Sequence, residues 1–140
     1  MKKLLNILIL ILITNLANGQ YFQTGQDPSF IKWKQINTEH FQLIYPQESE
    51  KQAQRLTYIF EKVYDYGIHT LNFSPKKISI ILHTHTANSN GLLAWAPKRI
   101  ELFTTPNQQI YAQDWYEQLA IHEFRHLVQM DKIQDAMPGL

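Results

Sequence analysis

The chain has 140 residues, of which 13 are Lys or Arg and 12 are Asp or Glu, so its formal net charge at pH 7 is +1. This near balance, without any long basic run, speaks against nucleic acid as a partner. The sequence contains no Cys, which excludes disulfides, thiolate metal ligands and the lipid-bearing Cys of a bacterial lipoprotein.

The N-terminus is typical of a secretory signal peptide over residues 1–19. Lys2 and Lys3 form a basic start, residues 4–16 are mostly apolar, and small residues at 17 and 19 fit a cleavage site. We expect cleavage after Gly19 and a mature protein that is secreted, periplasmic or on the outer cell surface, with no transmembrane span. An uncleaved membrane anchor is the alternative, although the apolar run is short for a bilayer.

The first half of the mature chain predicts two strands, a helix and a third strand. Apolar and polar residues alternate over 33–36 and 41–45, as in half-buried strands. Over 49–66 the apolar residues recur every three or four positions, which predicts an amphipathic helix with Gly67 as its C-cap. The β-branched run 78–82 is typical of an interior strand.

The next segment predicts a turn and two further strands. Asn90-Gly91 is a strong turn signal, and apolar stretches follow at 92–96 and 99–103. Pro97 between them belongs at a sheet edge or a bulge. With a second helix after them, the order β-β-α-β-β-β-α predicts one α+β domain, in which both helices pack on a mixed, mostly β sheet.

The second helix should run over about 115–132. Asp114 is suited to the N-cap, and Glu117 is placed to complete a capping box. Projection at 100° per residue puts His122, Glu123 and His126 on the side opposite the main apolar stripe. That stripe consists of Tyr116, Ala120, Ile121, Phe124, Leu127 and Val128.

The sequence His122-Glu123-Phe124-Arg125-His126 is the motif that carries chemistry. Two His residues four apart on a helix can offer two imidazole nitrogens to one Zn²⁺ ion. Glu123 then occupies the general-base position of an H-E-x-x-H hydrolase. The alternative is that these residues merely decorate a solvated helix face.

This motif, within this order of elements, resembles the N-terminal half of the zincin catalytic domain, closest to secreted bacterial domains of the gluzincin type. The resemblance covers about residues 30–130 and implies an exported zinc metallopeptidase that acts on peptides or proteins. It places the substrate-binding edge at residues 92–103. The residues implied to bind substrate are Leu93, Ala94, Trp95 and Ala96. Similar domains carry a downstream β-propeller, which this chain lacks, and a cell-envelope partner is also expected.

The third zinc ligand departs from the family pattern. Gln129 and Lys132 stand where a metzincin has Gly and a third His, and no Glu follows Glu123 to serve as the gluzincin ligand. We therefore expect a domain that is incomplete at its C-terminus over residues 20–140. One alternative is that His83 or His85 completes the site. Another is a zincin-like interaction domain of a cell-envelope protein without hydrolytic activity.

Overall fold

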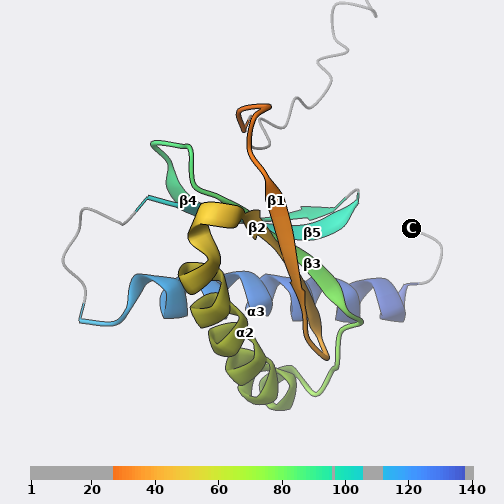
Figure 1. Ribbon diagram of the computed structural model, residues 1–140. Helices are drawn as coiled ribbons and strands as arrows, with labels where there is room; N and C mark the ends of the chain where they lie inside the picture. Colours follow the sequence, from red (N-terminus) through yellow and green to blue (C-terminus); the bar gives the residue numbers. More distant parts are fainter. Residues whose placement is uncertain (1–26, 96, 106–111, 138–140) are drawn as a thin grey trace, which may run out of the picture.

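A computed structural model of the chain describes residues 27–95, 97–105 and 112–137 (Figure 1). The predicted signal peptide lies outside these residues. The elements are β1 (Trp33–Asn37), β2 (Phe41–Pro46), the short 3-10 helix η1 (Gln47–Ser49), α2 (Glu50–Leu71), β3 (Ile78–His83), β4 (Ser89–Trp95), β5 (Lys98–Thr104) and α3 (Trp115–Ala136). The α+β class and the predicted order of strands and helices are confirmed.

The five strands form one mixed sheet in the order β1-β2-β3-β5-β4. β2, β3 and β5 run parallel to one another, whereas β1 and β4 are antiparallel to their neighbours. The segment 92–103, predicted to be the substrate-binding edge, is divided between two strands of this sheet. Its first half belongs to the edge strand β4, but its second half belongs to β5, which is paired on both sides.

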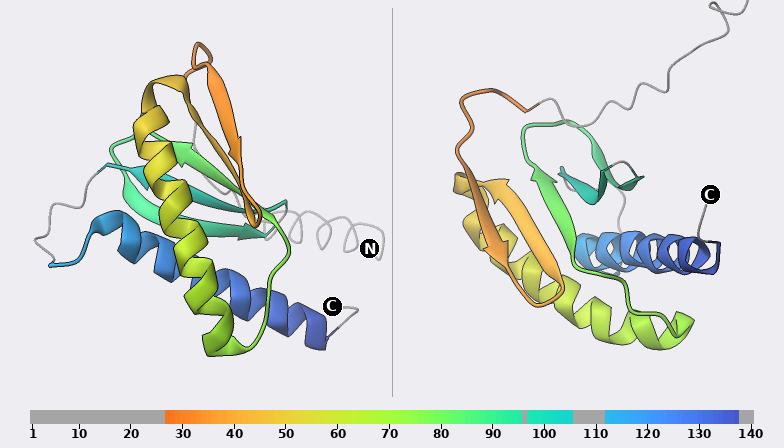
Figure 2. Two further views of the ribbon diagram at one scale, coloured as in Figure 1. Left: turned by 60° about the horizontal axis from the view of Figure 1, so that its bottom comes forward. Right: turned by 90° about the vertical axis from the view of Figure 1, so that its right-hand side faces the viewer.

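Both helices pack on the same face of the sheet (Figure 2). α2 contacts β1 and β2, α3 contacts β4, and the two helices contact each other. Alternate strand residues point into this layer, and Leu43, Ile80, Ile100 and Leu102 are almost completely buried there. Among the helices that the structure describes, none combines the length and the apolar character needed to cross a bilayer.

α2 continues beyond the predicted C-cap Gly67 and ends at Leu71. Asn72 is the actual C-cap. It adopts a left-handed conformation with φ of 49°, and its N–H donates to the Ile68 carbonyl. A side chain at Gly67 would collide with the ring of Phe124 on α3. Gly67 is therefore a point of close helix–helix approach and not a helix terminator.

The predicted turn at Asn90-Gly91 is also wrong, because both residues lie within β4. Gly91 pairs with Leu102 of β5, and its position facing α3 is occupied by the side chain of Glu123. The actual hairpin turn lies after Trp95, which pairs with Lys98, and Pro97 stands in that turn.

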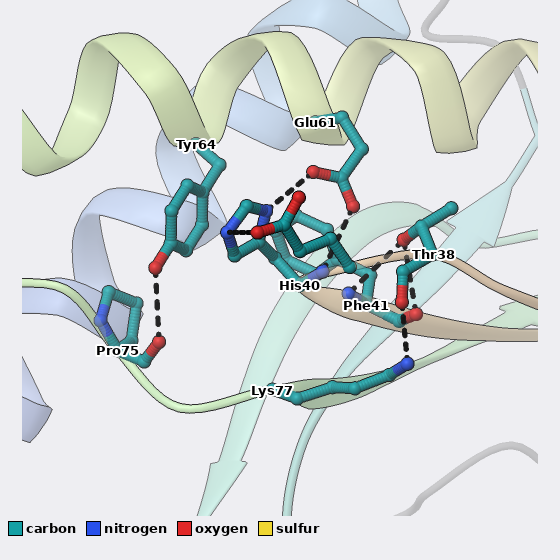
Figure 3. A network of polar contacts seen from close by, with 8 residues as sticks. Thr38, His40, Phe41, Glu61, Tyr64, Pro75 and Lys77 are labelled. Carbon is teal, nitrogen blue, oxygen red and sulfur yellow. Dashed lines mark hydrogen bonds and ion pairs between the residues drawn. The ribbon is translucent and has the colours of Figure 1, made fainter.

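A polar network fastens the β1–β2 connection to α2 (Figure 3). The Glu61 carboxylate accepts the His40 backbone N–H at 3.1 Å and lies 2.7 Å from His40 Nδ1. The His40 ring stacks on Tyr64 with centroids 3.6 Å apart. Partial burial by itself would raise the pKa of Glu61, but hydrogen bonds from His40 and Thr38 outweigh it and lower that pKa below its usual 4.5.

Glu61 should therefore stabilise the fold in its ionised form. A carboxyl with a lowered folded-state pKa adds stability that is present above the unfolded-state pKa, and this stability is lost as the pH falls through the folded-state pKa. We expect Glu61→Gln to reduce the free energy of unfolding at pH 7 by about 1 kcal/mol. In urea denaturation, this difference should shrink below about pH 4.5.

The matched control is Glu117→Gln, which changes an exposed Glu in the first turn of α3. It should alter the free energy of unfolding by less than about 0.5 kcal/mol at any pH. A Glu61→Gln effect of constant size from pH 3 to pH 7 would show that the charge of Glu61 does not stabilise the fold.

Candidate functional site

The N-terminus of α3 is fixed by its cap and by α2. The Asp114 carboxylate accepts from the backbone N–H groups of Tyr116 and Glu117 at 3.1 and 3.3 Å, so the predicted N-cap is confirmed. The same carboxylate accepts from Arg55 of α2 at 2.8 Å. Gln52 of α2 is also hydrogen-bonded to the Tyr116 hydroxyl. These contacts set where the helix begins, and so where each later residue points.

The rotation of α3 differs in part from the helical projection. Ile121, predicted in the apolar stripe, is 45% exposed, whereas Glu123, predicted on the opposite side, is only 3% exposed. The cause is β4, which covers the Glu123 side of the helix and turns the buried stripe toward the sheet. The buried residues of α3 are Leu119, Ala120, Glu123, Phe124, Leu127, Val128 and Asp131.

The imidazoles of His122 and His126 face each other on the exposed side of α3. Their Nε2 atoms are 3.0 Å apart, and the ring planes are perpendicular with centroids separated by 4.5 Å. One helical turn separates the two residues, which explains why the rings meet. Since both side chains are open to solvent, a ligand can approach both nitrogens at once.

Glu123 lies between this His pair and the edge strand. A Cβ atom built on Gly91 would be 2.7 Å from Glu123 Oε1, so the Glu side chain passes directly beside the β4 backbone. Burial raises the pKa of Glu123 above its usual 4.5, and the neighbouring His122 partly opposes this effect. The carboxyl thus takes up and releases a proton at a higher pH than a solvated Glu.

The four predicted substrate-binding residues do not all face the same side. Leu93 and Trp95 lie on the same face of β4 as Gly91, toward α3, whereas Ala94 lies on the other face. Leu93 packs against the core, and Trp95 is 43% exposed. Ala96 lies outside the described residues.

Asp131, the first acidic residue after His126, forms an ion pair with Lys98 of β5. Its carboxylate is 7% exposed and accepts from Lys98 Nζ at 2.7 and 2.8 Å. This pair ties the C-terminal half of α3 to the start of β5. Sequence reasoning missed the partner because the two residues are 33 positions apart.

His83 belongs to a separate buried cluster on the sheet face away from the helices. Its Nδ1 lies 2.6 Å from Asp27 Oδ2, and its Nε2 lies 3.4 Å from Glu101 Oε2. Arg99 Nε donates to the other Glu101 oxygen at 2.6 Å. His85 is exposed after the end of β3.

Among the residues that the structure describes, no group of three or more His, Cys, Asp or Glu side chains could hold a metal ion. Neither His83 nor His85 therefore joins His122 and His126 in a three-ligand site. Residues 1–26, 96, 106–111 and 138–140 contain none of these four residue types.

A groove of about 300 Å³ runs between α2 and α3, but the His pair does not line it. Its walls are mostly apolar and include Tyr58, Tyr66 and Ile121. The groove and the His pair therefore lie on different faces of α3.

Comparison of the chain with known protein families, curated proteins and solved structures gives no match.

The burial of Glu123 predicts a pH-dependent cost to stability. A carboxyl with a raised folded-state pKa favours the fold below its unfolded-state pKa, and this contribution is lost as the pH rises through the folded-state pKa. We expect metal-free Glu123→Gln to be at least as stable as wild type at pH 7 in urea denaturation. Its advantage should grow as the pH rises above about 4.5.

Glu123→Ala is the matched control, because it removes the same charge but leaves the space beside Gly91 unfilled. It should be less stable than Glu123→Gln at every pH. If Glu123→Gln were less stable than wild type at pH 7 and equally stable at pH 4, the carboxylate would be stabilising the fold and this prediction would be wrong.

Proposed function

We propose that this protein is an exported zinc-dependent metallopeptidase with a zincin-like fold, in which His122 and His126 bind zinc and Glu123 is the general base. The observation that carries the proposal is the facing pair of His Nε2 atoms, 3.0 Å apart, on the same helix turn as a buried Glu. The proposed location is the cell exterior or periplasm.

The His pair fits a zinc ion in its donor type and spacing. Two nitrogens at the usual zinc–nitrogen distance, on adjacent corners of a tetrahedron, are about 3.3 Å apart. The observed 3.0 Å needs only a small side-chain adjustment. Two imidazoles and no thiolate also suit a catalytic zinc better than a structural one.

Glu123 can act on water held beside the two imidazoles. A zinc ion there would supply Lewis-acid activation of that water and of the substrate carbonyl. Glu123 accepts the proton from the attacking water and returns it to the amine that leaves when the peptide bond breaks. The closeness of Glu123 to the β4 backbone at Gly91, and the effect of His122 on its pKa, support this role.

The edge strand β4 is the proposed substrate-binding element. Its outer edge has no neighbouring strand among the described residues, so an extended peptide can pair with it through backbone hydrogen bonds. Trp95 is exposed on the face toward α3 and offers an apolar contact for a substrate side chain. Leu93, Ala94 and Ala96 complete the proposed substrate-binding segment.

A second candidate function follows from the number of zinc ligands. A catalytic zinc site has three protein ligands, and the described residues bring together only two. The metallopeptidase proposal therefore requires a third ligand in addition to His122 and His126. Without it, the zincin-like domain would serve as an interaction module of a cell-envelope protein.

Zinc binding can be measured by competition with a chromophoric chelator. We expect His122→Ala and His126→Ala each to weaken zinc affinity by about tenfold or more, because each removes one of two ligands. His69→Ala, which removes an exposed His in the last turn of α2, should bind zinc like wild type. Equal affinity in all four proteins would exclude His122 and His126 as ligands.

Hydrolysis can be followed with a fluorescently labelled unfolded protein as substrate. We expect zinc-dependent cleavage that Glu123→Gln reduces by about 100-fold or more, while zinc affinity stays unchanged. Normal cleavage by Glu123→Gln would remove the general-base role. Zinc binding by wild type without any cleavage would favour the interaction-domain function.

A further inference from the structure

Gly91 is buried in the edge strand, directly beside Glu123. A Cβ atom at this position would lie 2.7 Å from Glu123 Oε1, 2.8 Å from Cγ and 3.0 Å from Cδ. Cβ atoms in proteins essentially never make contacts shorter than 3.0 Å. The Glu123 side chain therefore occupies the space that any other residue at position 91 would fill.

The strand itself gives no reason for a glycine at this position. Gly91 pairs with Leu102 in the regular antiparallel register, and its φ lies outside the left-handed region. Glycine in the interior of a strand is unfavourable, because it loses backbone entropy and has no side chain to pack. Close approach of another group is the usual reason for keeping one, and here that group is Glu123.

We infer that Gly91 is a positioning residue for Glu123: the missing side chain forms a slot that holds the carboxylate between β4 and α3, beside His122. This inference rests on the proposed function, since it assigns a role to Gly91 in that same site. Any side chain at position 91 would push Glu123 into another rotamer. The His122 and His126 rings, on the exposed side of α3, would stay in place.

This geometry predicts that a substitution at Gly91 displaces the proposed base Glu123 but not the proposed metal ligands His122 and His126. The end of the Glu123 side chain is flexible, so it can leave the slot with little loss of stability, yet even a small displacement removes the base from reach of the reacting water. A change at Gly91 should therefore lower kcat and leave zinc affinity and KM nearly unchanged. A merely structural role for Gly91 would not separate these quantities.

The test compares Gly91→Ala with Gly67→Ala in the full chain. Gly67 faces Phe124, the residue after Glu123. Its substitution by Ala therefore causes a similar steric clash with the same helix. We expect Gly91→Ala to lower kcat by about tenfold to a hundredfold. Zinc affinity and KM should stay within about twofold of wild type. Gly67→Ala should lower the urea midpoint more and keep kcat per folded molecule. An equal loss of kcat per folded molecule in Gly91→Ala and Gly67→Ala would overturn the positioning role.

A double-mutant cycle on stability tests the contact without any enzymatic activity. In a Glu123→Ala background the slot is empty, so adding Gly91→Ala should raise the urea midpoint. In wild type the same substitution should leave the midpoint unchanged or lower it. If cleavage is absent but this coupling is present, the proposed function fails and the steric slot stands. If the two substitutions are additive, the slot itself is refuted.

Discussion

Two consecutive residues of α3 press on glycines from two different elements. Glu123 fills the space beside Gly91 of β4, and Phe124 fills the space beside Gly67 of α2. Phe124 also contacts the rings of the buried aromatic core. Phe124, packed against Gly67 and the buried aromatic rings, sets the rotation of the helix, which directs Glu123 toward Gly91 and leaves His122 and Arg125 on the outside. The arrangement of the candidate site follows from that rotation.

The fold could be predicted to the level of its elements, because strands and helices are encoded locally. Alternation over β2 and the N-cap Asp114 of α3 are features of a few neighbouring residues. Local sequence does not reveal the role of the two glycines, because that role depends on distant contacts. Gly67 and Gly91 have the local appearance of a helix end and a turn, but each is required by a side chain from a distant part of the chain.

The candidate site also combines features that local sequence predicts with features that depend on distant contacts. The meeting of His122 and His126 depends only on helix periodicity, so the spacing predicts it. The burial of Glu123 depends on which strand covers α3, which no local pattern contains. The pairing of His83 with Asp27 joins residues 56 positions apart, and the sequence could not distinguish this buried His from a metal ligand.

α3 is held against α2 at both of its ends. At one end Arg55 binds the cap residue Asp114, and at the other Lys132 donates to the Leu71 carbonyl at 2.8 Å. Together with the packed core between the two helices, these contacts oppose sliding and pivoting of α3 when a ligand binds. The α3 side of the candidate site is therefore preorganised. Any conformational change on binding is expected in β4 and in the ligand.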